Sequence, residues 1–420
     1  MKNFSLLFLL TLWVVPATAV TTNYSGTVID AQSKKPIVDA MVTLGNTVTH
    51  TTANGKFQIS GSGDQLGIRA YAHLRQEMAT PTAPKDATIA LEPFTPKALY
   101  LSFYGIGDRH LREAALKLMA ETELNALVID LKGDRGWVSF KSDTALASTI
   151  GAQKIITIKN LKTLAADLHA KKIYSIARIV VFKDSPLAAN RPELAIKTAS
   201  GAIFRDREGL AWCNPYSRAV WDYNIDLAVE AARAGFDEIQ FDYVRFPDRR
   251  GLVYPMPNTE VNRVAAISGF FAEARKRLTP YNVFLSADLF GYVVWNSNDT
   301  DIGQKLENLA PALDYMSFML YPSGFQFGIP GYLNPVHHPK EIIYLTLEKA
   351  KQRTGLPGIR FRPWLQAFRD YAFDRTQFGA SQIRAQIEGA DQSNSNGWML
   401  WNPHNVYAND GLRLETRNKP

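Results

Sequence analysis

Strand-like and helix-like segments alternate along most of this chain, and the alternation constrains its fold more than any other feature. A repeated order of strand, helix and strand is typical of parallel β/α units. The strand-like segments are Ala98–Tyr104, Ala126–Lys132, Tyr174–Phe182, Glu238–Phe246, Val283–Gly291, Tyr315–Pro322, Arg360–Phe368 and Gly397–Pro403. Helical patterns between them include His110–Thr122, Leu161–Ala170, Tyr216–Ala234, Glu260–Leu278, Lys340–Arg353 and Gln377–Gly389. Eight such strands predict an α/β fold, specifically a (β/α)8 TIM barrel.

An open, doubly wound sheet is the alternative arrangement of such units. It usually carries a glycine-rich phosphate loop after its first strand. Here the first strand is followed at 104–109 by YGIGDR, which has two glycines and no third at the required spacing. We interpret this segment as a plain turn and therefore prefer the barrel.

The region from Tyr24 to Leu91 differs from the rest, because its segments are short, β-like and separated by turn signals. This predicts a small all-β sandwich domain at residues 20–93, with Pro93 and Pro96 marking a linker to a barrel domain at 94–420. The order Gly26-x-Val28, Pro36-Ile37, Ala40-x-Val42 and Asn54-Gly55-x-Phe57 resembles the carboxypeptidase regulatory-like domains. That resemblance implies a spacer or a weak binding role for the sandwich.

The first residues have the pattern of a secretory signal peptide. Lys2 precedes the short apolar run Phe4–Val15, and residues 16–19 read PATA, which ends in a small-x-small cleavage pattern. The run is shorter than the roughly 20 residues that a membrane-spanning helix needs. We therefore predict cleavage after Ala19, a periplasmic or secreted protein, and no stable membrane span once the signal is removed.

Cysteine and charge usage narrow the possible functions. The only cysteine, Cys213, excludes an internal disulfide, so the stability of an exported chain must come from a large core. The net charge of +7 is dispersed and forms no basic stripe, which argues against nucleic-acid binding. His337 and His338 are adjacent between prolines, and His50, His73, His110 and His169 are scattered, so the sequence predicts neither a metal site nor another cofactor.

Polar and aromatic residues lie in or at the end of seven of the expected strands, where the strands of a TIM barrel open onto one mouth. These candidates are Asp130, Lys132, Arg178, Asp242, Arg245, Asp288, Tyr321, Trp364, Gln366 and Trp401. Carboxylates, donors and flat rings together suit a polyhydroxylated substrate. Structural roles are the alternative: Asp242 as a partner of Arg178 or Arg245, Asp288 as a loop cap, and the two tryptophans as packing residues.

Several motifs occur in an order that resembles the putative glycosyl hydrolase domain family of bacterial barrels. They are ALVIDLKGDRG, ARIVVFKDSPLA, WCNPYSRAVWDYN, GFDEIQFDYVRFPD, LSADLFG, IGQKLENLA, DYMSFMLYPSGF and RPWLQAF. The resemblance covers residues 97 to about 405, and it implies a TIM barrel and the hydrolysis of glycosidic bonds.

Glycosidic cleavage requires a proton donor and a second carboxylate that attacks the sugar or activates water. We expect Asp242 to be the ionised carboxylate, because Arg178 and Arg245 favour its charged form. Asp288 has no cation adjacent in sequence and is expected to be the general acid, although the two roles are exchangeable. The sequence thus predicts an exported glycoside hydrolase acting on a polysaccharide. The rival interpretation is a catalytically silent glycan-binding protein that uses the same barrel mouth.

Overall fold

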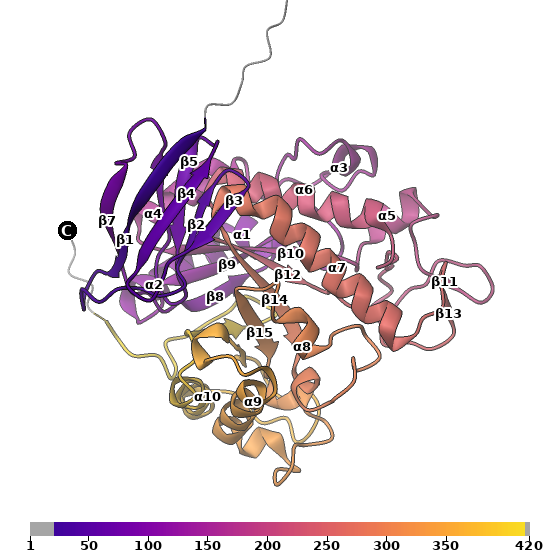
Figure 1. Ribbon diagram of the computed structural model, residues 1–420. Helices are drawn as coiled ribbons and strands as arrows, with labels where there is room; N and C mark the ends of the chain where they lie inside the picture. The colour runs from indigo at the N-terminus through magenta and orange to yellow at the C-terminus, as the bar shows by residue number, and fades with distance from the viewer. Residues whose placement is uncertain (1–20, 416–420) are drawn as a thin grey trace, which may run out of the picture.

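A computed structural model describes residues 21–415 of the chain. The predicted signal peptide at 1–19 lies outside the described residues. Eight parallel strands close into a barrel in the order β10-β12-β14-β15-β16-β17-β8-β9 (Figure 1). Their bounds are β8 Lys97–Leu101, β9 Ala126–Lys132, β10 Tyr174–Val180, β12 Glu238–Asp242, β14 Phe284–Phe290, β15 Tyr315–Met319, β16 Trp364–Gln366 and β17 Trp398–Trp401. The predicted (β/α)8 barrel is confirmed.

Helices surround the barrel and cover the outer faces of its strands (Figure 1). They are α1 Phe103–Gly107, α2 Arg109–Glu121, α3 Ala145–Thr149, α4 Leu161–Ala170, α5 Ser185–Asn190, α6 Arg218–Ala234, α7 Glu260–Leu278, α8 Leu306–Leu309, α9 Pro339–Thr354 and α10 Ala380–Gln392. Each long helix begins and ends for a local reason. In α7, the hydroxyl of Thr259 accepts from the N–H of Asn262, and in α6 the left-handed Gly235 (φ 104°) ends the helix.

Side chains alternate along the barrel strands and form two separate cores, one between the strands and the helices and one inside the barrel. Leu99, Ile129 and Phe241 point outward into the large core shared with the helices. Tyr100, Trp364 and other inward residues fill the inside of the barrel. Because successive strand residues point to opposite faces, the last inward residue of each strand is placed at the mouth.

Two sheets form the N-terminal region. One has the strand order β4-β1-β7 and the other β3-β2-β5-β6. The bounds are β1 Thr22–Asp30, β2 Met41–Leu44, β3 Thr47–His50, β4 Lys56–Gly61, β5 Gln65–Arg69, β6 Gln76–Ala79 and β7 Asp86–Leu91. Val28 of β1 and Val42 of β2 share one buried cluster, so the sheets pack face to face. This strand-rich region agrees with the expected all-β fold, whereas its kinship to carboxypeptidase regulatory-like domains stays a prediction.

The sandwich is docked on the end of the barrel opposite the mouth, where the strands begin. Tyr71 lies edge-on to Tyr315, the first residue of β15, with ring centroids 6.1 Å apart. Phe94 packs 5.3 Å from the ring of Tyr174, which begins β10. Arg69 is buried and donates to Asn282 over 3.2 Å. The lower end of the barrel is therefore closed by the sandwich.

Two further strands join loops at the mouth. β11 (Lys197–Thr198) follows β10 in the chain and pairs with β13 (Leu252–Val253), which follows β12. Figure 1 shows this pair projecting from the end of the barrel opposite the sandwich. Within residues 21–415, no helix is both long enough and apolar enough to cross a membrane.

Candidate active site

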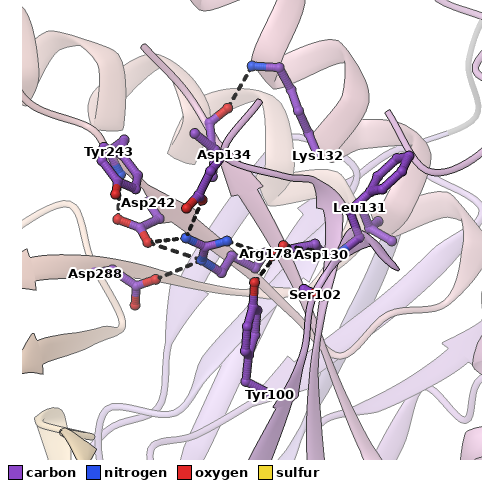
Figure 2. A network of polar contacts seen from close by, with 12 residues as sticks. Tyr100, Ser102, Asp130, Leu131, Lys132, Asp134, Arg178, Asp242, Tyr243 and Asp288 are labelled. Carbon is purple, nitrogen blue, oxygen red and sulfur yellow. Dashed lines mark hydrogen bonds and ion pairs between the residues drawn. The ribbon is translucent and has the colours of Figure 1, made fainter. Parts of the chain in front are cut away.

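Arg178 is the centre of the barrel mouth, and four carboxylates surround its guanidinium (Figure 2). Its Nε and Nη2 donate to Oδ2 of Asp242 over 3.0 and 2.5 Å. Nη1 donates to Asp130 over 2.6 Å, and Nη2 also donates to Asp134 over 3.0 Å. Oδ2 of Asp288 lies 3.6 Å from Nε. One buried cation thus gathers carboxylates from β9, β12, β14 and the loop after β9.

Asp130 is held from the side of β8 as well. Its Oδ2 accepts from the hydroxyl of Tyr100 over 2.7 Å and from the N–H of Phe103 over 3.2 Å. Burial raises the pKa of Asp130 to about 6, although the adjacent Arg178 acts in the opposite direction. Both carboxylate oxygens of Asp130 already accept hydrogen bonds, from Arg178, Tyr100 and Phe103. Asp130 is therefore suited to hold Arg178 in position.

Asp242 ends β12 and reaches open space. The next residue, Tyr243, has a left-handed backbone (φ 50°), and its N–H donates to Oδ1 of Asp242. A positive φ is strained for a bulky residue with a Cβ, and such strain is enriched at functional sites. The turn leaves Asp242 and the Tyr243 ring on the wall of a cavity of about 230 Å³, which Tyr292, Tyr321 and Tyr371 also line.

Asp288, on the neighbouring strand β14, is 1% exposed and lies deeper than Asp242. Its Oδ1 accepts a 2.6 Å hydrogen bond from Nε1 of Trp364, while its Oδ2 has no hydrogen-bond partner among the described residues. Burial raises the pKa of Asp288 well above its ordinary range, and the charge of Asp242 raises it further. The site therefore pairs an arginine-bound carboxylate with a carboxyl group that favours its protonated form.

Aromatic rings form the opposite wall. Trp401, at the end of β17, stacks on Tyr100 with centroids 3.9 Å apart, and the guanidinium of Arg178 lies 5.1 Å from the Trp401 ring. Both rings line a second cavity of about 220 Å³, together with Asp130 and Asp134. Stacked rings beside polar groups suit the apolar faces and hydroxyls of a sugar.

The structure brings most of the predicted site residues to the mouth. Asp130, Arg178, Asp242 and Asp288 form the ionic centre, and Tyr321, Arg245 and Trp401 line the cavities around it.

One predicted binding residue lies elsewhere, and two others have different roles. Lys132 is fully buried and contacts Asp184 over 2.7 Å on the outer side of the barrel, because a register shift in the β9–β10 pairing turns it away from the mouth. The amide of Gln366 is occupied by Ser323, which it meets at 2.7 and 3.0 Å. Trp364 is 1% exposed, so it supports Asp288 and offers no open platform.

The sequence analysis did not single out Tyr100, Asp134 or Tyr243. Tyr100 lies in the first predicted strand segment, two residues after Ala98, and both side chains point into the barrel. The alternation of side chains along that strand could therefore have identified it. Asp134 lies in the loop KGDRG, and nothing local indicates that it bends back to Arg178. Tyr243 directly follows β12, which ends at Asp242, and its place at the mouth depends on the left-handed turn there.

Within residues 21–415, no group of three or more His, Cys, Asp or Glu side chains is arranged to hold a metal ion. Cys213 is buried, and burial raises the pKa of its thiol well above the ordinary value. A thiol that stays protonated is a poor nucleophile.

Comparisons with known proteins agree with this geometry. A family model described as "Putative glycosyl hydrolase domain" matches residues 98–407. The solved glycoside hydrolase domain of PgaB (BpsB) from Bordetella bronchiseptica is 14% identical, with a TM-score of 0.55 over 74% of this chain and 95% of that one. The β-galactosidase from Marinomonas ef1 is 10% identical, with a TM-score of 0.51 over 73% of this chain and 54% of that one. These two likenesses show the barrel fold.

A hypothetical protein from Ruminiclostridium thermocellum is 38% identical over 45% of this chain and 96% of its own, with a TM-score of 0.40. No curated protein matches the chain.

Proposed function

The chain belongs to the "Putative glycosyl hydrolase domain" family through residues 98–407, and from this premise we propose that it is an exported glycoside hydrolase that cleaves a polysaccharide. One observation carries the proposal: Asp242 and Asp288, on neighbouring strands, face the same nitrogen, Nε of Arg178. An arginine-bound carboxylate beside a buried carboxyl group whose pKa is raised is the kind of pair that acid/base cleavage of a glycosidic bond requires.

Asp242 is the ionised member of the proposed pair. Its two hydrogen bonds to Arg178 and one from the N–H of Tyr243 are all made to the charged form. It also lines the cavity, so a sugar bound there would meet it directly. The negative charge would stabilise the oxocarbenium-like transition state, either by attack on the anomeric carbon or by activation of a water.

Asp288 is the proposed proton donor. Its raised pKa keeps the carboxyl protonated, and its unpartnered Oδ2 carries a transferable proton. Tyr321 lines the same cavity as Asp242, and burial raises the pKa of its hydroxyl well above the ordinary value.

The ion pairs of Arg178 are also compatible with a second candidate function. A guanidinium that already holds Asp242, Asp130 and Asp134 forms a complete ionic network, and this network could serve a catalytically silent glycan-binding protein equally well. Glycan binding by this mouth is common to both candidates, so turnover is the property that separates them.

The test is a screen of the purified protein against bacterial exopolysaccharides and peptidoglycan, with detection of new reducing ends. Hydrolysis that is lost in both Asp242→Asn and Asp288→Asn supports the enzyme. Glycan binding by the wild type without any release of reducing ends would favour the silent binding protein. Export is tested separately, by N-terminal sequencing of the mature protein, for which we expect a new terminus after Ala19.

A further inference from the structure

A groove of about 600 Å³ lies beside the proposed catalytic cavity, between the loops that follow β10 and β12. Tyr243 and Arg245 line both spaces, so the groove and the cavity are neighbours that share these two side chains. The pairing of β11 with β13 ties the two loops together. The groove is therefore a built part of the mouth.

Six cationic side chains line the groove: Lys183, Arg205, Arg207, Arg245, Arg249 and Arg250. Three carboxylates line it as well, Asp206, Glu208 and Asp248. Lys183, which is 2% exposed, lies 3.3 Å from Asp206 and 2.8 Å from Glu208, so this buried lysine already balances much of their charge. The remaining arginines outnumber the remaining carboxylate, and the groove is positive.

The arginines differ in how firmly they are held. The guanidinium of Arg245 lies beside two rings, 5.0 Å from the centroid of Trp212 and 5.3 Å from that of Tyr243, and the residue is only half-buried. Its Nη1 donates to the carbonyl of Phe246 over 3.1 Å, and its other donors have no hydrogen-bond partner among the described residues. Arg205, Arg207, Arg249 and Arg250 are exposed at the rim. Among them, Arg250 has one distant carboxylate, Asp301, at 3.9 Å. An oriented cation at the inner end and several exposed ones at the rim form a graded path for an anion.

From this geometry we infer that the polymer is acidic and that its sugars carry carboxylate or sulfate groups, one of which pairs with Arg245 while the neighbouring sugar occupies the cavity at Asp242. The inference rests on the proposed function, because it assigns a substrate class to the same mouth. A planar guanidinium held over aromatic rings presents its donors in the fork that matches a carboxylate or a sulfate.

The experiment measures binding independently of turnover. The full chain carrying Asp242→Asn is titrated with polygalacturonate for the carboxylate, dextran sulfate for the sulfate ester, and uncharged dextran. We expect one or both polyanions to bind at least about 10-fold more tightly than dextran, with an affinity that falls as salt rises. The two polyanions distinguish the two acidic groups.

A matched pair of variants separates the groove from the general charge of the protein. Arg249→Gln/Arg250→Gln removes two cations from the groove rim, and Lys117→Gln/Lys276→Gln removes two exposed cations from helices α2 and α7. The rim variant should weaken polyanion binding at least about 10-fold, and the helix variant less than about twofold. Arg245→Gln should lower affinity further while its melting temperature stays close to that of the wild type.

Three results would overturn the inference: equal losses in the two matched variants, equal affinity for dextran, or equally tight binding of a single-stranded oligonucleotide, which would indicate unspecific attraction. Cleavage of a neutral glycan with no preference for polyanions would support the hydrolase and contradict the acidic substrate. Polyanion binding that depends on the groove, without hydrolysis of any acidic polymer, would support the acidic ligand and contradict the hydrolase.

Discussion

Asp288 combines near-complete burial with an oxygen, Oδ2, that has no hydrogen-bond partner within residues 21–415. A carboxylate in such a place loses its hydration, and without full pairing it favours the neutral form. The folded pKa is therefore raised above the value in the unfolded chain. The folded state then binds the proton more tightly than the unfolded state does, so its contribution to stability is present at acidic pH and is lost as pH rises through the folded pKa.

This linkage predicts a pH effect on both stability and turnover. As pH rises through the raised pKa of Asp288, the wild type should lose melting temperature, and kcat/KM should fall because the proton donor is deprotonated. Asp288→Asn should lack that part of the stability loss. Thermal melting of both proteins from about pH 5 to about pH 9 checks the prediction. Parallel curves would show that Asp288 does not titrate in this range.

Asp242→Asn tests the other carboxylate. Turnover should fall at least about 100-fold, because the charge facing the developing cation is removed. Arg178 keeps Asp130 and Asp134, so the melting temperature should change little. Turnover and melting temperature measured on the same Asp242→Asn protein check this prediction. Full activity in that variant would contradict a catalytic role for Asp242. A stability loss of about 3–5 kcal/mol would indicate a structural ion pair instead.

At the residue scale, the sequence was informative where strand alternation holds. Asp130, Arg178, Asp242 and Asp288 were all expected at one mouth and do meet there. Lys132 shows the limit, since one register shift reversed its direction, and a shift of this kind leaves no local sequence signal.

At the scale of elements, the predicted segments match closely where hydrophobic periodicity has clear boundaries. β9, α4 and α7 have the predicted bounds. β12 was predicted to continue to Phe246 but ends at Asp242, because the left-handed Tyr243 interrupts an otherwise strand-like pattern. β16 is only three residues long, although the apolar pattern around it is longer. Ends set by backbone strain or by distant contacts cannot be inferred from periodicity alone.

The two tryptophans of β16 and β17 should respond differently to truncation. Trp364→Ala removes a buried ring and the donor to Asp288, and it should lower the free energy of unfolding by about 3–5 kcal/mol. Trp401→Ala removes a partly exposed ring at a cavity wall, so it should weaken glycan binding more than it lowers stability. Urea unfolding and glycan titration of both variants provide the comparison. Equal destabilisation would place Trp401 in the core.

At the scale of the whole molecule, the sandwich and the barrel share buried surface. Arg69, itself 2% exposed, donates to Asn282 and lies 4.0 Å from Asp314. The side-chain amide of Asn282 returns a hydrogen bond to the carbonyl of Gln76 over 3.0 Å. The sequence indicated the two folds and the linker between them, but nothing in it predicted this interface, because the contacting residues are more than 200 positions apart.

The interface predicts that a fragment of residues 94–420 is less stable than the full chain. Without the sandwich, the ring of Tyr315 at the lower end of the barrel loses its contact with Tyr71 and becomes exposed, whereas Phe94, which packs on Tyr174, stays in the fragment. We expect a lower melting temperature and a tendency to aggregate. Adding the separately purified sandwich should partly restore the transition. An equally stable, soluble fragment would show that the barrel closes on its own.

The sandwich can dock only after much of the barrel has been synthesised. The sandwich is synthesised first, yet its partner Asn282 follows Arg69 by 213 residues. A sandwich that folds before the barrel is complete therefore has an unsatisfied docking face. That face meets its partners only once β14 and β15 have been made.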